Sequence, residues 1–210
     1  MTNAPKRPLK RRRLGRDERR RLILEGATRL FARSGLRGVS LDEIAAASGV
    51  TKPVLYDHFP SKEALYLSAL ERVRGELLAL GAQGVETPGS PEARVQAALL
   101  GFFGYARGQP EAMRLLLSAS GEAALDERAA RIQDEVTDQL LGLFLSLLPA
   151  PPPSAEAARL RLQMEFIKQG LHGLAAWWPG HPEVTGEQLA DSVLRVMWNG
   201  LARLFPEEKG

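Results

Sequence analysis

Hydrophobic residues recur every three or four positions along most of this chain, which is the spacing of amphipathic α-helices. No segment is convincing as a β-strand. The first run predicts a helix from about residue 16 to residue 34, ended by Gly35, with four residues turned inward: Ile23, Ala27, Leu30 and Phe31. The pattern therefore predicts an all-α protein.

Beyond residue 60, the same spacing predicts six helices. The first begins after Ser61 and is ended by the Gly/Pro-rich segment 81–91; its apolar positions are Leu65, Ala69, Val73, Leu77 and Leu80. A stiff proline run at 149–153 cannot continue a helix and is expected to be a connector. The other expected helices are 91–107, 110–119, 122–148, one from about residue 160 to 178 and one from 187 to 204.

Residues 35–62 differ from the rest, because they predict two brief helices joined by a glycine turn. Ser40 followed three residues later by Glu43 is the pattern of a capping box, and Gly49 stands where the turn needs a positive φ. Thr51 can cap the second helix. This arrangement is a helix-turn-helix, which places its second helix in the major groove of DNA.

The two brief helices have an inner and an outer side. Ala45 is small enough to let them cross closely, and Pro60 and Ser61 end the second helix and begin the next. The apolar residues expected inside are Ile44, Ala45, Val50, Leu55 and Phe59. The residues left at or near the surface are Lys52, Pro53, Val54, Tyr56, Asp57 and His58.

Charge is divided unevenly along the 210 residues, whose formal net charge is +3. Residues 1–62 hold 15 Lys/Arg and 6 Asp/Glu, a balance of +9, whereas residues 63–210 hold 13 and 19, a balance of −6. The positive charge thus accompanies the helix-turn-helix, as expected where a protein binds a polyanion. The acidic remainder should avoid DNA.

The first fifteen residues are polar and interrupted by proline, so we expect a disordered arm. One interpretation is a solvated tail that aids solubility. The other is an arm that follows DNA phosphates or enters the minor groove, and its proximity to the helix-turn-helix favours this second interpretation. The cations that would do so are Lys6, Arg7, Lys10, Arg11, Arg12 and Arg13.

Several classes of protein are excluded by composition. The chain has no cysteine, which rules out disulfides and thiolate metal sites and favours the reducing cytoplasm. No apolar run approaches the ~20 residues of a membrane span, and the basic N-terminal segment lacks the apolar stretch of a secretory signal. We find no catalytic motif, and His172 and His181 lack the spacing of a metal pair. We therefore expect no enzyme, cofactor, metal site or membrane partner.

The segment 21–70 resembles the DNA-binding domain of the tetracycline-repressor (TetR) family of bacterial transcription regulators. About a quarter of the chain carries the resemblance, which is specific in combination. The remainder is similar to the family only in length and helical character. The matching residues are Leu30-Phe31-Ala32, Gly35, Gly38-Val39-Ser40, Ile44-Ala45, Ala47-Ser48-Gly49-Val50-Thr51, Leu55-Tyr56, His58-Phe59 and Ser61-Lys62-Glu63-Ala64-Leu65.

The resemblance implies which residues contact DNA. Lys52 would donate to guanine or to a phosphate, and Pro53 and Val54 would touch thymine methyl groups. Hydroxyl groups and helix N-terminal amides at Ser40 and Thr51 would reach phosphate oxygens. The predicted DNA-binding residues are Ser40, Thr51, Lys52, Pro53, Val54, Tyr56, His58 and Lys62, together with Arg11, Arg12 and Arg13 of the arm; packing alone remains an alternative for Tyr56.

The last two predicted helices carry an assembly signal, since each is apolar on two faces and must bury both. In the first, one face is Leu160, Met164, Ile167, Leu171, Leu174 and Trp178, and the other is Leu162, Phe166, Gly170, Gly173 and Trp177. In the final helix, one side is Leu189, Val193, Met197, Gly200 and Leu204, and the other is Leu194, Trp198, Leu201 and Phe205. A monomeric core is one explanation. The resemblance favours a homodimer through a four-helix bundle of these helices, which matches a palindromic operator.

A ligand site is harder to identify from the sequence, because Met and aromatic residues at helical spacing usually belong to the hydrophobic core. Glu165 or His172 could orient a polar group of a mainly apolar effector. The candidate ligand-binding residues are Phe102, Phe103, Tyr105, Met113, Met164, Phe166, His172 and Trp177.

Together these features predict three parts: a disordered basic arm at 1–15, a three-helix DNA-binding domain at 16–62, and an effector-binding and dimerisation domain at 63–210. The resemblance implies a cytoplasmic regulator that binds double-stranded DNA, most simply a repressor released from a palindromic operator by a small apolar effector. A constitutive or architectural DNA-binding protein without an effector is the alternative, and a helical adaptor for another protein is a third.

Overall fold

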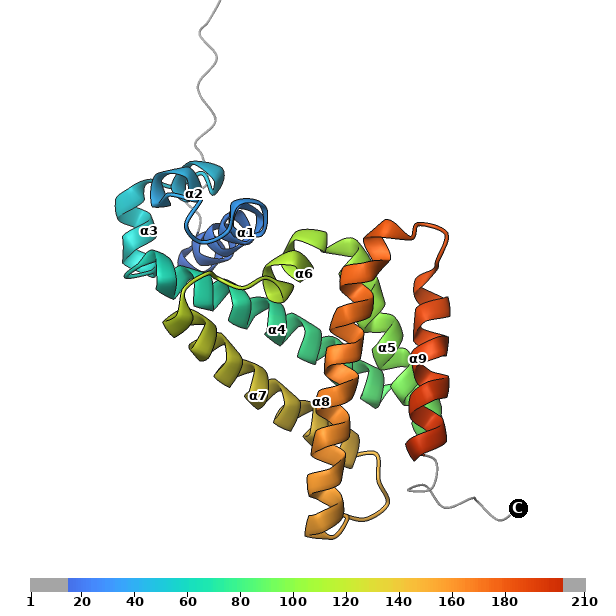
Figure 1. The fold of residues 1–210 in the computed structure, drawn as a ribbon. Helices are drawn as coiled ribbons and strands as arrows, with labels where there is room; N and C mark the ends of the chain where they lie inside the picture. Colours follow the sequence, from blue (N-terminus) through green and yellow to red (C-terminus); the bar gives the residue numbers. More distant parts are fainter. Residues whose placement is uncertain (1–14, 202–210) are drawn as a thin grey trace, which may run out of the picture.

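A computed structural model describes residues 15–201, whose regular elements are all helices, with no β-strand in that range (Figure 1). The predicted all-α fold is therefore confirmed. The predicted arm, including Arg11, Arg12 and Arg13, and the residues after Leu201 lie outside the described range. The helices are α1 (Arg16–Ser34), α2 (Leu41–Ala47), α3 (Lys52–His58), α4 (Lys62–Glu86), α5 (Pro91–Gly108), α6 (Pro110–Leu117), α7 (Ala123–Leu145), α8 (Ser154–Trp177), a 3₁₀ turn (Trp178–Gly180) and α9 (Gly186–Leu201).

Helices α1–α3, here called the head, gather at one end of the molecule (Figure 1). Helix α1 occupies the predicted bounds, and Gly35 follows it with a φ of 68°. Ile23, Ile44 and Leu55, one from each helix, are fully buried and form the centre of the head. The short helices are thus held by packing, because seven-residue helices are too short to be stable alone.

Helix α4 leaves the head and runs through the body, the name used here for α4–α9 (Figure 1). Helix α4 ends inside the predicted Gly/Pro-rich segment 81–91, but it passes through Gly81 and Gly84 and continues to Glu86. A tertiary contact explains the extension. A Cβ atom on Gly84 would lie 2.4 Å from the Cα of Ala98, so this glycine allows α4 and α5 to approach closely.

The other body helices pack on α4 or on one another. Helices α5 and α7 both pack on it, α9 packs on α5, and α8 packs on α6 and α7. Two predicted helix ends were too late: α6 ends at Leu117 rather than 119, and α7 at Leu145 rather than 148. Turns replace the last residues of α7, because the amides of Leu147 and Leu148 each bond a carbonyl only three residues back.

The head contacts the body through α4 and α6. Arg33 of α1 forms an ion pair of 3.2 Å with Glu111 of α6, and α1 also packs along α4. Because one hydrophobic core runs through both parts, the predicted domain boundary at residue 62 stays a prediction. Within the described residues, no helix is long and apolar enough to cross a membrane.

Candidate DNA-binding surface and ligand cavity

The α2–α3 pair is built from local capping interactions. The hydroxyl of Ser40 accepts a hydrogen bond from the Glu43 amide, and the Glu43 carboxylate accepts one from the Ser40 amide at 2.7 Å. These bonds lower the pKa of Glu43, because they stabilise its ionised form. Gly49 has a φ of 66° in the turn, and Thr51 stands at the N-cap of α3 without a side-chain capping bond. The turn thus directs α3 across α2.

The outer side of α3 is largely exposed to solvent. Lys52, Pro53 and Tyr56 are exposed, Tyr56 to 47%, while Val54 and His58 are partly buried. Leu55 and Phe59 face the core, and Val50 is partly buried against it. The helix therefore presents a mixed polar and apolar surface, which suits both phosphate contacts and thymine methyl groups.

Lys52 is paired rather than free. Its ammonium group lies 2.8 Å from a carboxylate oxygen of Asp42 on α2, and both side chains are about half exposed or more. The hydrogen bond to Asp42 raises the pKa of Lys52, so this lysine stays charged. Sequence analysis missed Asp42 as the residue that holds Lys52 in position, since ten positions separate the two.

Three arginines of α1 lie beside His58 at the end of α3. Burial lowers the pKa of His58, and the nearby guanidinium groups of Arg16, Arg19 and Arg20 lower it further. Arg20 also stacks over the ring of Phe59 at 4.5 Å from its centroid. Sequence analysis did not single out these α1 arginines. The signal was available, because the three cations occupy the first turns of a helix adjoining the basic arm.

Two predicted DNA contacts serve the head itself. Lys62 donates to the backbone carbonyl of Val39 at 3.1 Å and so anchors the start of α4 to the segment before α2. The Ser40 hydroxyl is bound to Glu43 in both directions. Both residues remain near the surface. To contact a phosphate, each would have to keep or exchange the hydrogen bond that it makes within the protein.

The body contains a largely apolar, partly open cavity of about 160 Å³, lined by α4, α5, α7 and α8 with single residues from α6 and α9. That volume is close to the engineered apolar cavities that accept benzene-sized molecules. Its lining includes Leu77, Leu78, Val85, Leu99, Phe102, Val136, Leu140, Leu143, Phe144, Met164, Ile167 and Leu171. Four polar side chains also reach it, namely Arg74, Gln133, Lys168 and His172.

The predicted ligand residues separate into two groups. Phe102, Met164 and His172 line the cavity together. The other five do not. Phe103 and Met113 are buried in the core, and Tyr105 donates a hydrogen bond to Glu76. Phe166 and Trp177 lie on the outer side of α8, exposed to 75% and 44%. Helical spacing alone does not say which apolar face of a helix is buried.

The buried polar groups of the cavity were not predicted, apart from His172. Lys168 is only 3% exposed, and it bonds Glu165 at 2.7 Å, the Thr137 hydroxyl and the Gln133 carbonyl. Hydrogen bonds from Lys168, Thr137 and Gln169 outweigh burial and lower the pKa of Glu165 to about 2. Lys168 interrupts an apolar helix face, and that interruption was the signal available in the sequence.

His172 has a strongly shifted titration. Burial, and to a smaller extent the ammonium group of Lys168, lower its pKa to about 4. Its ring stacks beside Phe102 with 6.5 Å between centroids. The imidazole is therefore neutral at physiological pH and presents one donor and one acceptor. No group of three or more metal-binding side chains occurs among residues 15–201.

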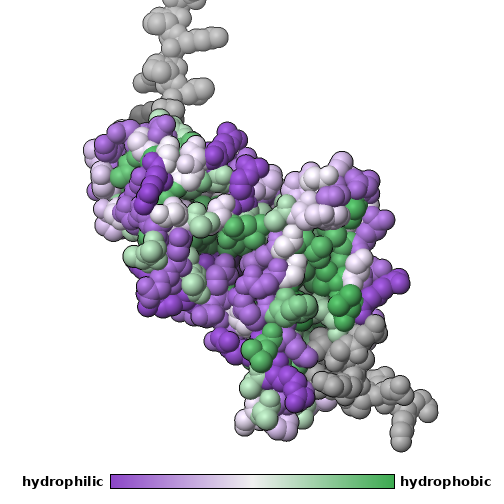
Figure 2. Space-filling view, viewed as in Figure 1, coloured by the Kyte–Doolittle hydropathy of each residue, from purple (hydrophilic) through white to green (hydrophobic). Residues whose placement is uncertain are grey.

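An exposed apolar face runs along α8. Leu162 and Phe166 are 70% and 75% exposed, and Val196 of α9 is 73% exposed. Figure 2 shows hydrophobic surface over α8 and between α8 and α9. The opposite face of α8 packs on the core through Leu160 and Met164. In α9, Leu189 and Leu194 are buried, whereas the predicted positions 200–205 offer no described side chains.

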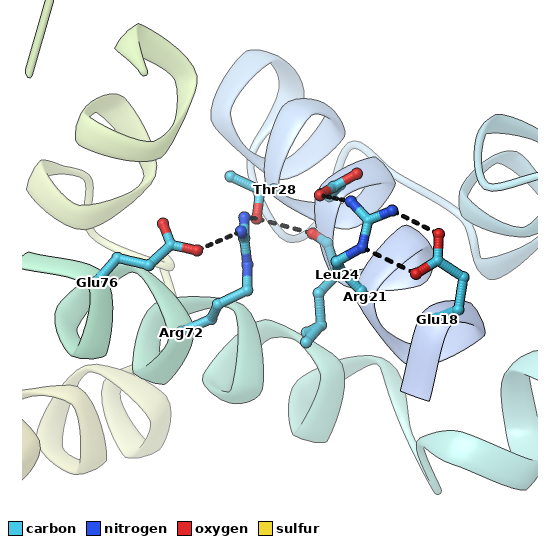
Figure 3. Close-up of polar contacts among 7 residues, drawn as sticks. Glu18, Arg21, Leu24, Thr28, Arg72 and Glu76 are labelled. Atoms are coloured by element: carbon cyan, nitrogen blue, oxygen red, sulfur yellow. Dashed lines mark hydrogen bonds and ion pairs between the residues drawn. The ribbon is translucent and has the colours of Figure 1, made fainter. Parts of the chain in front are cut away.

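A polar chain links the head to the body (Figure 3). Arg72 of α4 donates to the Thr28 hydroxyl of α1 at 3.2 Å and forms an ion pair of 2.7 Å with Glu76. Glu76 in turn accepts a hydrogen bond from Tyr105 of α5 at 2.6 Å. Burial, and then this bond, raise the pKa of Tyr105. A shift of α4 relative to α1 would therefore disturb a defined set of contacts.

Comparison with known proteins agrees with this geometry. The family model described as "Bacterial regulatory proteins, tetR family" matches residues 23–69. The HTH-type transcriptional activator FasR of Mycolicibacterium smegmatis is 27% identical over 193 residues, covering 91% of this chain and 87% of that protein. The HTH-type transcriptional repressor KstR2 of Rhodococcus jostii is 23% identical over 191 residues, covering 90% and 93%. A solved TetR-like transcriptional regulator from Rhodococcus sp. RHA1 is 25% identical, covers 90% and 99%, and superposes with a TM-score of 0.68.

The helical fold and its helix-turn-helix head define a DNA-binding transcriptional regulator. Residues 23–69 belong to the TetR family of bacterial regulatory proteins, and nine-tenths of the chain is similar to regulators of that family.

Proposed function

We propose that this regulator is a homodimeric repressor that binds a palindromic operator and is released by an effector held in the body cavity. The observation that best supports this proposal is the exposed outer side of α3, which belongs to a capped and packed helix-turn-helix. A dimer would set two α3 helices in successive major grooves, roughly 34–36 Å apart. Its place of action would be the cytoplasm.

The DNA contacts are proposed on the basis of exposure and charge. Lys52, Pro53 and Tyr56 are exposed on α3, and Arg16, Arg19 and Arg20 add positive charge beside its end. Phosphate contacts of this kind release counterions, so affinity should fall steeply with salt. Lys52 would exchange Asp42 for a phosphate or a guanine, which keeps its charge paired in both states.

The dimer is proposed from the exposed face of α8. Leu162 and Phe166 present a contiguous apolar surface one helical turn apart, and a monomer gains nothing by leaving it in water. The nearby Gly170 and Gly173 have open space around them, so a second backbone can come close. A two-fold dimer would bury the face of both copies at once.

The effector is proposed to act on α4. This helix both lines the cavity and begins in the head, where Lys62 is bonded to Val39. An effector that fits one position of α4 better than another shifts the dimer toward that position, by at most its difference in affinity for the two. The contacts among Thr28, Arg72 and Glu76 would differ between the positions.

Selection from randomised duplex DNA at near-physiological salt tests the proposal. We expect a palindrome, and we expect Tyr56→Ala with Lys52→Ala to weaken binding to it at least tenfold. Arg131→Ala, which removes an exposed cation from α7, is the control and should have little effect. Recovery of no motif would instead favour the architectural alternative.

Sedimentation tests the dimer separately. Phe166→Glu should produce monomers at concentrations where the parent chain is dimeric, because it places a charge in an apolar interface. Ala130→Glu adds the same charge to an exposed position of α7 and should leave the assembly unchanged. A dimer that survives Phe166→Glu would show that another surface mediates assembly.

A further inference from the structure

The polar side chains of the body cavity lie at one end, and the other end is apolar. Arg74 and Gln133 stand at the beginning of the lining segments of α4 and α7, and Lys168 and His172 stand at the facing part of α8. Beyond them, the α4 lining continues through Leu77, Leu78, Gly81 and Val85 without a polar side chain. Eleven residues separate Arg74 from Val85, which is about 16 Å along the helix.

Arg74 is an incompletely paired cation at the polar end. The residue is only 4% exposed, and its Nη2 donates to the backbone carbonyl of Ala129 at 3.0 Å. Its Nε and Nη1 atoms are buried and have no hydrogen-bond partner within the described part of the chain. Buried guanidinium groups are normally paired with carboxylates or fully bonded, because an uncompensated buried charge is costly.

Among the described residues, no carboxylate completes the pairing of Arg74. Burial lowers the pKa of Arg74, although Glu71, Tyr66 and Glu135 act in the opposite direction. None of these three lines the cavity. Glu165 is engaged by Lys168, Thr137 and Gln169, so it is not available to Arg74.

Lys168 provides a contrast within the same cavity. Its ammonium group has three partners and a carboxylate among them, so its donors are fully used. Arg74 therefore differs from Lys168 in keeping two donors unused. The lining contains two cations and no carboxylate, and an anionic ligand would balance this charge.

We propose that the effector of this cavity is an amphiphilic acid: its carboxylate binds the Arg74 guanidinium and its apolar part extends along α4 and α7 toward Val85 and Leu147. This inference rests on the proposed effector function and names the chemical class. Neighbouring atoms cover Nε and Nη1 in the ligand-free structure. On binding, the guanidinium rotates toward the cavity and forms a bidentate pair with the carboxylate. Neutral His172 donates or accepts one further hydrogen bond there.

Calorimetry without DNA tests the site. The probes are pentanoate, hexanoate and octanoate, which suit a cavity of about 160 Å³, each compared with the alcohol of the same chain length. We expect at least one acid to bind at least tenfold more tightly than its alcohol, since only the acid pairs with Arg74. If no acid binds more tightly than its alcohol, the proposal is overturned. This comparison uses the unmodified chain and does not depend on the folding of any variant.

Substitution then assigns the contact. Arg74→Met keeps the apolar stem and should weaken binding of the acid at least tenfold, while binding of the alcohol stays the same or improves. Arg131→Met removes a cation from the outside of α7 and should change neither. Unchanged affinity for the acid in Arg74→Met would place the carboxylate elsewhere and overturn the assignment. Should Arg74→Met not fold, Arg74→Lys keeps the charge but loses the two-bonded geometry, and an intermediate loss of affinity is expected.

Release from the selected operator separates this inference from the proposed function. Binding of the acid through Arg74 without loss of operator affinity would keep the site and reject the acid as an inducer. Absence of operator binding by the chain itself would reject the proposed function, and calorimetry would still decide the site.

Discussion

The head and the body bury apolar helices in the same way but differ in what positions their polar residues. In the head, Ser40 bonds Glu43 three positions away, and Ser61 caps α4 by accepting from the amide of Ala64. In the body, Arg74 bonds Ala129, and Lys168 bonds Gln133, partners 55 and 35 positions distant. A surface made of near neighbours can be located from sequence, whereas a cavity is defined by contacts between distant helices.

The largest effect is expected from Leu55→Ala, which removes the fully buried centre of α3. Loss of packing should lower the free energy of unfolding by about 3 kcal/mol. The head and the body share one hydrophobic core, so they are able to unfold together. Chemical denaturation of the variant measures whether the head unfolds with the body or separately. A single transition would mean that the two regions fold as one unit. Two transitions, with only the first shifted, would establish the head as a separate domain.

Acid should destabilise the body through His172. Its folded pKa of about 4 lies below the unfolded value of 6.5, so the stabilisation is complete above pH 6.5 and is lost as the pH falls toward 4. The loss amounts to about 2–3 kcal/mol. Lys168 and Arg74 favour the neutral ring, and Glu165 opposes them.

Melting temperatures between pH 7 and pH 4 measure this loss. His172→Gln cannot titrate there, so its stability should decline less steeply than that of the parent chain. Equal slopes for both proteins would mean that other groups dominate the acid response.

Two glycines of α4 separate the effect of tertiary packing on stability from the effect of local helix propensity. Gly84→Ala places a methyl group against the backbone of Ala98 and should cost about 2 kcal/mol. Gly75→Ala has open space and should raise stability by up to about 1 kcal/mol, the difference in helix propensity. Chemical denaturation measures both. Equal effects of the two substitutions would contradict the close packing of α4 on α5.

The smallest effect is expected in the head from Asp42→Asn. This change removes a negative charge beside the proposed DNA surface and frees Lys52, so affinity for the operator should rise by a few fold, about 0.5–1 kcal/mol. Binding at two salt concentrations measures it, and the gain should shrink at higher salt. Weaker binding would mean that Asp42 is needed to hold Lys52 in its binding position.

Much of the fold could be predicted because helix signals are local. The bounds of α1, the capping box of α2 and the positive φ of Gly49 follow from residues at most a few positions apart. Helix ends in the body were harder. Glycine normally weakens a helix, yet α4 passes through Gly81 and Gly84 because packing on α5 stabilises it. That partner cannot be identified from the α4 segment alone.

The sequence by itself determined an all-helical chain with a capped helix-turn-helix, because hydrophobic spacing, caps and turn residues act over one or two helical turns. It also marked two apolar faces on α8. Only the tertiary structure decided that Met164 looks into a cavity while Phe166 faces outward, and that Arg74 keeps two buried donors without a partner. These outcomes depend on how α4, α7 and α8 cross, and burial and hydrogen bonding between distant helices have no local signature.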